Sequence, residues 1–219
     1  MKTAIIFGSS GLVGNHLLNL LIKDNYYSKI KIFVRNKNIF KNSKVEIIYM
    51  DFRKIDDYSH LIKGDDCFFC IGTTKNDTPD KNEYRRVEYE IPVKIASVAK
   101  KNNITSFMYL SSLASTTKTK NIYLKNKGEA EEALKNLNFS RLSIIRPSLM
   151  LGYRNKFRLG EFIGQLIFKN LSFLFQGSLK QYRAIDSKNV AKAMVYISKN
   201  DFKDIYFDSS NLENLSKKI

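Results

Sequence analysis

Apolar positions follow two different periods along this chain: short apolar runs suit strands, and longer stretches repeat their apolar residues at helical spacing. Strands are expected at residues 3–7, 29–34, 45–49, 66–71, 106–110, 140–145, 182–185 and 204–207. Helices are expected at residues 11–23, 84–101, 123–137, 158–169 and 187–199, and a polar tail follows residue 207. Alternating strands and helices, with strands apolar on both faces, are typical of a parallel sheet covered on both sides. We therefore expect an α/β fold with a doubly wound parallel sheet.

The first expected strand runs directly into a glycine-rich turn, Gly8-Ser9-Ser10-Gly11-Leu12-Val13-Gly14, and a helix begins there. This order of elements indicates the phosphate-binding start of a Rossmann fold. Gly8 permits the tight turn, Gly11 lets the backbone approach a pyrophosphate, and Gly14 lets the helix pack against the strand. Backbone N–H groups and the positive helix end then face the phosphates. The motif predicts dinucleotide binding, with the spacing G-x-x-G-x-x-G rather than G-x-G-x-x-G; a turn without a ligand is the alternative.

The end of the second strand indicates which dinucleotide is preferred. NAD sites usually place Asp or Glu there, about 20 residues past the glycine turn, against the ribose 2′-hydroxyl. This chain has Arg35, followed by Asn36 and Lys37, and no acid. A guanidinium can pair bidentately with a 2′-phosphate, so we expect NADP(H) over NAD(H), unless Arg35 is only a surface arginine. Asp51 and Phe52, after the third strand, are expected to meet the adenine.

Ser112, Tyr123 and Lys127 are the candidate catalytic residues. Ser112 ends a central strand, and Tyr123 and Lys127 share one face of the helix that follows. A lysine ammonium beside a phenol favours the phenolate, which suits Tyr123 to donate and accept a proton near neutral pH. Ser112 would hydrogen-bond the same substrate oxygen. The spacing Tyr-x-x-x-Lys also occurs at residues 27–31, where a strand begins, so only the pair at 123 and 127 is expected to act.

These motifs, followed by Arg146-Pro147-Ser148 after the sixth strand, together resemble the short-chain dehydrogenase/reductases. The arginine-proline pair resembles the extended and atypical branches of that superfamily. Cys70-Ile-Gly-Thr-Thr74, Leu110-Ser-Ser112 and Gly160-Glu-Phe162 more closely resemble the small Tat-interacting-protein type oxidoreductases and their bacterial relatives. The resemblance covers nearly the whole chain.

The resemblance implies a role for each matching residue. Tyr123 would be the acid and base, Lys127 would also hold the nicotinamide ribose, and Ser112 would orient the carbonyl. Four further residues would lie along the cofactor or near the nicotinamide: Gly72, Thr73, Pro147 and Ser148. The chain starts at its first strand, without the N-terminal extension of larger animal members, so partner binding attributed to that extension is not expected.

We expect a single NAD(P)-binding domain over residues 1–219. Residues 1–147 would form the cofactor-binding core. The pattern loosens after Pro147, so residues 148–219 would form a small mixed substrate lobe and the last strand. Arg158 and Glu161 could reach a substrate there, and the apolar stretch Phe162–Phe175 would line the lobe core or a substrate pocket. Monomer and homodimer are both open.

The strongly basic composition has two interpretations. Lys and Arg number 37 against 21 Asp and Glu, which gives a net charge of +16. Such a charge suits nucleic acid or an acidic membrane surface. Lysine far outnumbers arginine, which is the better reader of bases and phosphates, and the lysines are scattered. A solvated lysine-rich surface therefore explains the charge, and no nucleic-acid partner is expected. No apolar run approaches the ~18 residues of a membrane span, so no membrane partner is expected either.

Cysteine and histidine offer no metal or redox site. Cys67 and Cys70 lie three apart on a strand and point to opposite faces, so they are expected to be structural. His16 and His60 have no ligand-spaced partners, so no metal is expected. Two cysteines suit a reducing compartment, and the first strand leaves no room for a signal peptide, so we expect a cytoplasmic protein.

Two functions from different classes follow. The first is an NADP(H)-dependent oxidoreductase that transfers a hydride to or from a small carbonyl or hydroxyl substrate, with Ser112, Tyr123 and Lys127 in the roles above. The second is an NADP(H)-binding sensor or regulator without turnover, since fold does not fix function. Such regulators often lose the Tyr and Lys, and both are present here.

Overall fold

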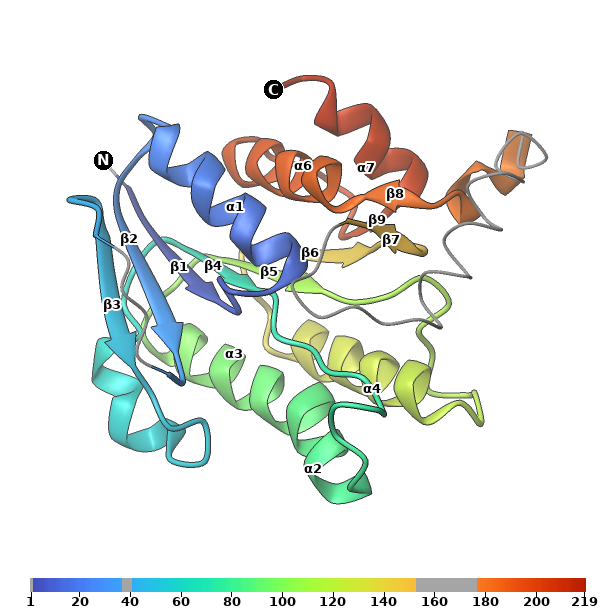
Figure 1. Cartoon of the computed structure of the whole chain (residues 1–219), viewed down its shortest axis with the longest axis horizontal. Coiled ribbons are helices and arrows are strands. Elements are labelled where there is room, and N and C mark those ends of the chain that lie inside the picture. Colours follow the sequence, from blue (N-terminus) through green and yellow to red (C-terminus); the bar gives the residue numbers. More distant parts are fainter. Residues whose placement is uncertain (1, 37–40, 153–176) are drawn as a thin grey trace.

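The computed structural model describes residues 2–36, 41–152 and 177–219. A parallel sheet of seven strands lies at its centre, in the order β3-β2-β1-β4-β5-β6-β9 (Figure 1). The strands are β1 (Lys2–Phe7), β2 (Tyr27–Val34), β3 (Val45–Tyr49), β4 (Asp66–Phe69), β5 (Ser106–Leu110), β6 (Arg141–Arg146) and β9 (Tyr206–Asp208). Each strand pairs in parallel with its neighbour. The expected doubly wound Rossmann sheet is confirmed.

Helices cover both faces of this sheet (Figure 1). They are α1 (Leu12–Lys23), α2 (Lys81–Arg85), α3 (Ile91–Lys101), α4 (Ile122–Asn136), α6 (Ser187–Lys199) and α7 (Ser209–Ser216). A 3₁₀ turn follows β3 (Ile55–Leu61), a second precedes β8 (Gly177–Tyr182), and a π-helical turn joins α2 to α3 (Arg86–Glu90). β7 (Met150–Leu151) and β8 (Ile185–Asp186) form a separate two-stranded sheet.

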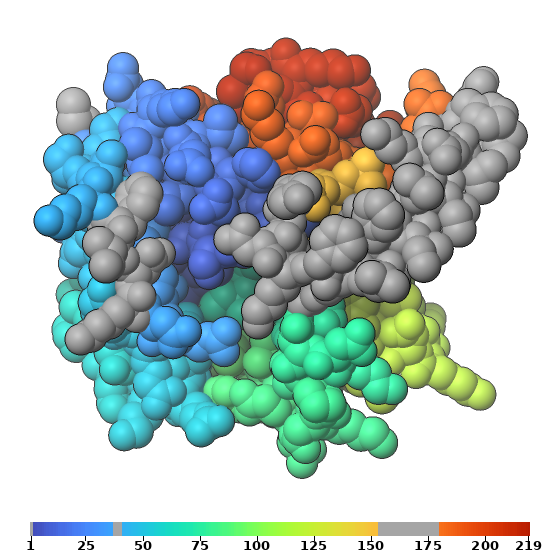
Figure 2. Space-filling model, in the orientation of Figure 1, coloured from blue at the N-terminus to red at the C-terminus, as the bar shows by residue number. Residues whose placement is uncertain are grey.

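The central strand β1 shows how the two faces are filled. Ala4 and Ile6 point to one face and pack in a core with α1, α6 and α7. Ile5 and Phe7 point to the other face and pack in a core with α3 and α4. All four side chains are fully buried. Figure 2 shows the same division: the residues of α1, α6 and α7 (blue, orange and red) lie above, and those of α2 to α4 (green to yellow-green) lie below.

The end of the chain differs from the expectation. The predicted polar tail is wrong, because α7 forms there. Asp208 caps this helix by accepting the amide of Asn211, whose side chain accepts the Asp208 amide in return. Leu212 and Leu215 then bury against α6. The capping residue Asp208 and the apolar pair Leu212 and Leu215 are visible in the sequence. The segment is nevertheless too polar and too short for its helical periodicity to be recognised.

Residues 185–219 contribute to the central sheet and to its helical covering, whereas a small mixed substrate lobe and the last strand were expected there. β9 extends the sheet beside β6, and α6 packs directly against α1. The strand expected at residues 182–185 is mostly wrong: a 3₁₀ turn ends at Tyr182, and only Ile185 and Asp186 pair, with β7. The helix expected at residues 158–169 lies outside the described residues, as do the stretch Phe162–Phe175 and the motif Gly160-Glu-Phe162.

The chain reverses direction across the sheet between β1 and β4. From β1 it proceeds outward to β2 and β3, and from β4 it proceeds the other way to β5, β6 and β9. The loops after β1 and β4 therefore leave the sheet on opposite sides of one crevice. Ligands of open α/β sheets bind at such a switch point, outside the carboxyl ends of the strands.

Candidate functional site

The glycine turn after β1 has the backbone that a dinucleotide requires. Gly8 has φ of +88°, a left-handed value, and a Cβ there would lie 2.7 Å from the carbonyl carbon of Cys70. A Cβ on Gly14 would collide with the Gly8 carbonyl oxygen, so the helix and strand can approach only with glycine. Gly11 is exposed, and its amide donates to the Gly8 oxygen at 3.0 Å, which closes the turn.

The start of α1 is open to an anion. Its N-cap is Gly11, which has no side chain to accept the first amide groups of the helix. Those groups carry the positive end of a helix of 12 residues. Ser10 is exposed beside them, whereas Ser9 and Val13 are buried, so those two residues offer a ligand only their backbone. Leu12 is half-buried at the same turn. The turn therefore fits the pyrophosphate of a dinucleotide.

Three arginines, Arg35, Arg53 and Arg86, lie near the carboxyl ends of β2 and β3, beside the glycine turn. Arg35 directly follows β2 and is exposed. Arg86 donates to the Phe52 carbonyl at 3.3 Å and forms an ion pair with Glu83. The hydrogen bond from Arg86 lowers the pKa of Glu83, and the charges of Arg53 and Arg35 lower it further. Three arginines therefore act on the Glu83 carboxylate in this region, which also contains Asp51 and Glu90.

The two residues expected at the adenine differ in exposure. Asp51 is exposed, and its carboxylate accepts the Arg53 amide at 2.9 Å. Phe52 is buried, with its ring edge-on to Phe7 at 6.3 Å between centroids. Only the backbone of Phe52 is available to a ligand. Its side chain belongs to the core beneath the crevice.

One face of α4 carries the candidate proton-transfer residues. Tyr123, Lys127 and Glu131 follow one another at four-residue spacing, so they form one stripe along the helix. Tyr123 is half-buried and lies within electrostatic range of Lys127. Ser112 is half-buried at the carboxyl end of β5, two residues beyond Leu110, whose carbonyl accepts a hydrogen bond from Lys127 at 3.0 Å. The structure therefore brings the three predicted residues to the same end of β5.

Lys127 is buried and does not stand alone. Its side chain is only 3% exposed, and Nζ lies 3.0 Å from Glu88 Oε2 and 4.7 Å from the ring centre of Tyr109. Burial by itself lowers the pKa of Lys127, but the Glu88 carboxylate, Tyr109 and Tyr123 together outweigh burial and raise that pKa above its usual range. The ion pair with Glu88 therefore favours the ammonium form of Lys127.

Glu88 was not among the residues predicted from the sequence. It is fully buried, and its Oε1 accepts the Thr73 amide at 2.5 Å, in the loop after β4. A Cβ on Gly72 would lie 3.5 Å from the same oxygen. Glu88 thus joins the two predicted loop residues to the predicted lysine. Glu88 stands among other charged residues, Arg85, Arg86 and Glu90, so nothing in the sequence marks it or pairs it with Lys127.

The helix that carries Glu88 is irregular at that residue. The expected helix 84–101 begins earlier, at Lys81, and contains a π-helical turn in which the Ile91 amide bonds to the Arg86 carbonyl. Pro92 has no amide hydrogen, so the Glu88 carbonyl lacks its usual helical partner four residues on. The Tyr109 hydroxyl donates to that carbonyl instead, at 3.4 Å. Single π turns are frequent at functional sites.

The arginine of the expected arginine-proline pair is structural. Arg146 forms an ion pair with buried Glu131, and its Nε donates to Glu131 Oε1 at 3.0 Å. The Ser111 hydroxyl donates to the same oxygen at 2.5 Å. Since Ser111 precedes Ser112 and Glu131 lies one turn beyond Lys127, this network holds α4 against the ends of β5 and β6.

Pro147 and Ser148 connect the site to the C-terminal segment. The Pro147 carbonyl accepts the amide of Leu113, which follows Ser112. The Ser148 amide donates to the Ser209 hydroxyl at 2.8 Å, and the Ser148 hydroxyl bonds to Ser209 and to the Arg183 carbonyl. The polar atoms of Ser148 are thus engaged with α7 and the β8 segment.

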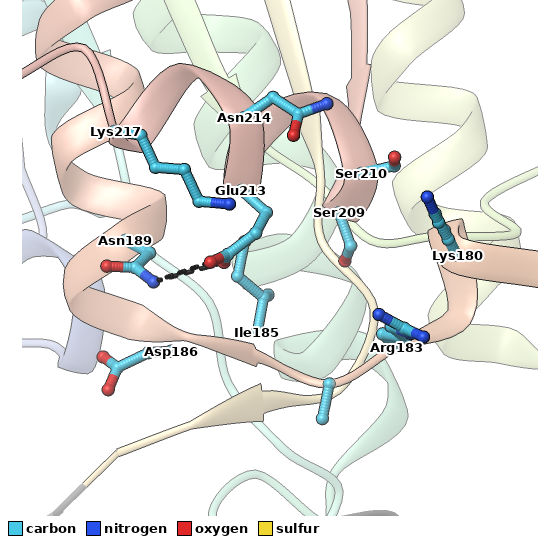
Figure 3. A pocket seen from close by; sticks show the side chains of 11 residues that line it. Lys180, Arg183, Ile185, Asp186, Asn189, Ser209, Ser210, Glu213, Asn214 and Lys217 are labelled. Carbon is cyan, nitrogen blue, oxygen red and sulfur yellow. Dashed lines mark hydrogen bonds between the residues drawn. The ribbon is translucent and has the colours of Figure 1, made fainter. Parts of the chain in front are cut away.

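A cavity of about 500 Å³ lies beyond these contacts (Figure 3). It is bounded by α6, α7 and residues 180–186, and Asn189 donates across it to Glu213 at 3.2 Å. Lys180, Arg183 and Lys217 also line it. None of the predicted catalytic or cofactor residues lines this cavity, so it is separate from the crevice at the glycine turn.

The two cysteines behave as the sequence predicts. Cys67 packs in the core with α3 and Cys70 against the core with α1, on opposite faces of β4, and both are free thiols. Burial raises the pKa of Cys70 to about 12. Within residues 2–36, 41–152 and 177–219, no cluster of His, Cys, Asp and Glu could hold a metal ion. No helix in those same ranges combines the length and apolarity of a membrane span.

The fold and this geometry define an α/β dinucleotide-binding protein, and sequence comparison identifies its family. The chain belongs to the NAD(P)H-binding family, which it matches over residues 8–201. Protein HTATIP2 of Rattus norvegicus is 33% identical over 174 residues, which cover 78% of this chain and 72% of that protein. Protein FMP52, mitochondrial, of Debaryomyces hansenii is 30% identical over 200 residues, 90% of this chain and 87% of that protein.

Solved structures support the same fold. The enzyme WbmH of Bordetella bronchiseptica, in complex with NAD⁺, superposes with a TM-score of 0.70 at 17% identity over 99% of this chain and 80% of that one. UDP-glucose 4-epimerase of Thermotoga maritima superposes with a TM-score of 0.71 at 13% identity, over 99% of this chain and 82% of that one. These structures show the Rossmann fold, and the match to the NAD(P)H-binding family agrees with the dinucleotide-binding motif of the sequence. The cytoplasmic location of the protein stays a prediction.

Proposed function

We propose that this protein is an NADP(H)-dependent oxidoreductase that interconverts a small carbonyl compound and the corresponding alcohol. The observation that carries the proposal is the placement of Lys127: it donates to the Leu110 carbonyl at the end of β5, two residues before Ser112, pairs with Glu88, and lies one helical turn from Tyr123. The dinucleotide would lie across the crevice, with its pyrophosphate at Gly11 and the start of α1. Gly72, Thr73, Pro147 and Ser148 would line its nicotinamide half.

The chemistry divides between the cofactor and the chain. A bound nicotinamide would supply or accept the hydride. In the direction of reduction, Ser112 Oγ donates a hydrogen bond to the carbonyl oxygen, and Tyr123 Oη donates the proton that this oxygen takes up. Lys127, held charged by Glu88, stabilises the phenolate that Tyr123 becomes. In the direction of oxidation, the phenolate of Tyr123 accepts the alcohol proton.

The arginines beyond β2 and β3 support the preference for NADP(H). Arg35 is the first residue after β2, at the position where NAD sites usually carry an acid. The charges of Arg35, Arg53 and Arg86 all act on Glu83, so a 2′-phosphate in this region would have arginine charges within electrostatic range. A bidentate pair between Arg35 and this phosphate would discriminate against NAD(H), which lacks it.

The first test is a fluorescence titration of the purified chain with NADPH and with NADH. We expect tighter binding of NADPH, and Arg35→Ala should weaken NADPH by about tenfold, which is ~1.4 kcal/mol, while NADH stays unchanged. Lys203→Ala is the matched control, since it removes an exposed charge at the amino end of β9, remote from the glycine turn. Equal affinities for both dinucleotides would remove the role of Arg35, and binding of neither would reject the dinucleotide site.

The second test addresses the proton. A panel of aldehydes and ketones is screened for NADPH consumption, and the best substrate is used with Tyr123→Phe. We expect turnover to fall by about 10²–10⁴-fold, the usual range for loss of a general acid, with NADPH affinity within a factor of about two. Unchanged turnover contradicts the mechanism. A chain that binds NADPH tightly but consumes none with any substrate is the non-catalytic sensor instead.

A further inference from the structure

Glu88 is a fully buried acid that contacts both the loop after β4 and Lys127. We propose that Glu88 is a positioning residue of the proton-transfer site: its carboxylate ties the Thr73 amide to the Lys127 ammonium and keeps that ammonium charged beside Tyr123. This inference rests on the function proposed above. It assigns the lysine a protein partner that is present before any cofactor binds.

The contacts of Glu88 are divided between its two oxygens. Oε1 accepts the Thr73 amide at 2.5 Å, and Oε2 lies 3.0 Å from Lys127 Nζ. The direction of the second contact makes it an ion pair rather than an aligned hydrogen bond, so Oε2 retains room to accept one. Lys127 donates instead to the Leu110 carbonyl at 3.0 Å. The ammonium is thus fixed by one charge and one carbonyl.

The backbone around Glu88 is shaped to direct its side chain inward. The π-helical turn Arg86–Glu90 interrupts the helix there, and Pro92 removes the amide that would bond to the Glu88 carbonyl. Tyr109 of β5 fills that gap with its hydroxyl at 3.4 Å, so α3 is tied to the strand that ends in Leu110 and Ser112. Glu88 is therefore held on both its backbone and its side chain.

Charge explains why a carboxylate is needed at this place. A lysine that is 3% exposed would lose its proton readily, because burial disfavours the ammonium. Glu88 opposes that effect more than any other neighbour, and with Tyr109 and Tyr123 it holds the pKa of Lys127 above its usual range. A neutral lysine could neither stabilise a phenolate at Tyr123 nor bind ribose hydroxyls as a cation. The pair also lowers the net charge of the site, since a lone buried ammonium would be strongly unfavourable.

Other titratable groups also lie within electrostatic range of Lys127. They are Tyr84 from α2, Cys70 after β4, Tyr109 from β5 and Tyr123 from α4. Burial raises the pKa of Tyr84 and of Cys70 to about 12, and it raises the pKa of Tyr109 as well. Among these neighbours, Glu88 is the carboxylate in direct contact with the ammonium, at 3.0 Å.

The test compares Glu88→Gln with the parent chain between about pH 6 and about pH 10. NADPH affinity is measured by fluorescence, and the protonation of Lys127 is followed by NMR of ¹³Cε-labelled lysine, with the signal assigned through Lys127→Arg. In the parent chain we expect Lys127 to stay charged and to leave the affinity flat. In Glu88→Gln, burial is unopposed, so Lys127 should lose its proton within this range. NADPH affinity should then fall by about tenfold as the pH rises.

Two further variants separate positioning from general damage. Glu88→Asp keeps the charge, so its pH profile should resemble that of the parent chain. Asp66→Asn alters a buried carboxylate at the opposite edge of the sheet, and it should lower stability without changing the pH profile of NADPH binding.

The outcomes distinguish the two proposals. A parent chain that binds no dinucleotide rejects the proposed function, while the NMR titration still tests the role of Glu88. If Lys127 titrates below about pH 10 in the parent chain, the role of Glu88 is overturned even if Glu88→Gln does not fold. If Glu88→Gln folds and gives the flat parent profile in both measurements, the role is overturned as well.

Discussion

The two edges of the central sheet each contain a buried carboxylate, and the two are used differently. At the amino edge, Asp66 starts β4, and its oxygens accept from Tyr27 at 3.1 Å, Arg141 at 2.6 Å and Lys2 at 3.4 Å. At the carboxyl edge, Glu88 meets one amide and one ammonium, and Oε2 lacks an aligned donor. The carboxylate of Asp66 has hydrogen-bond donors from the protein on both oxygens. The carboxylate of Glu88 has an aligned donor on Oε1 and none from the described residues on Oε2.

This difference indicates which edge is built for stability and which for a ligand. Asp66 links β1, β2, β4 and β6 through hydrogen bonds that require nothing from outside. The carboxyl edge combines the left-handed Gly8, the uncapped start of α1 and a buried ammonium. The glycine turn and the uncapped helix start therefore favour the carboxyl edge as the place where a further molecule binds.

The largest expected effect is on the amino edge. Asp66→Ala leaves Arg141 and the Tyr27 hydroxyl without their buried acceptor, so we expect the free energy of unfolding to fall by about 3 kcal/mol. NADPH affinity of the folded fraction should not change. Urea denaturation followed by circular dichroism measures the first quantity, and fluorescence titration the second.

A surface ion pair provides the control for that loss. Lys94 and Asp56 lie 2.7 Å apart and are both exposed, so Lys94→Met should change stability by less than about 1 kcal/mol. If Asp66→Ala lowered the affinity for NADPH and left the free energy of unfolding unchanged, the amino edge would not serve stability alone, and the comparison of the edges would be wrong.

The next effect is on the carboxyl edge. Gly14→Ala places a methyl group against the Gly8 carbonyl oxygen, so α1 must move away from the turn. We expect NADPH affinity to fall by about 100-fold, or ~2.7 kcal/mol, and stability to fall by about 1–3 kcal/mol through overpacking. Calorimetric titration and urea denaturation test the two losses.

Gly72→Ala is the matched control for stability. A methyl group at this position meets Glu88 Oε1 at 3.5 Å, an ordinary contact distance. Its unfolding free energy should therefore stay within about 0.5 kcal/mol of the parent value. Wild-type NADPH affinity in Gly14→Ala would mean that the glycine turn serves the fold alone.

The smallest expected effect is on stability, and it compares the hydroxyl groups of two buried tyrosines, one at each edge. Tyr27→Phe removes a hydroxyl that donates to charged Asp66 at 3.1 Å, and we expect a loss of about 1.5 kcal/mol. Tyr109→Phe removes a longer bond of 3.4 Å to an uncharged carbonyl, so its cost should be about 0.5 kcal/mol. Denaturation curves of both variants under one condition decide this order, and a larger loss for Tyr109→Phe would contradict it.

Local patterns predicted much of the site. Gly8, Gly11 and Gly14 follow a strand and open a helix, so their roles could be read before any tertiary structure. Tyr123 and Lys127 lie four residues apart on a helix, which fixes their common face. The cores on the two sides of β1 follow from alternation of apolar residues along a strand. Each of these arguments uses neighbours within about one or two turns of chain.

The missed features depend on contacts between distant segments. Glu88 and Lys127 come together because α3 and α4 pack on the same face of the sheet. The Arg146–Glu131 pair likewise depends on how α4 lies against β6. Helix α7 was missed because its two apolar residues make a core only where α6 already lies.

The sequence by itself determined the class of this protein. The alternation of strands and helices, the glycine turn and the Tyr-x-x-x-Lys spacing are local properties, since backbone geometry sets their periods. The tertiary structure decided the electrostatic state of the site. Whether Lys127 is charged depends on its burial and on a carboxylate 39 residues away, and both arise only when two helices close over β5. Coulomb energy depends on distance in space and on the surrounding medium, and neither quantity is written in the order of residues.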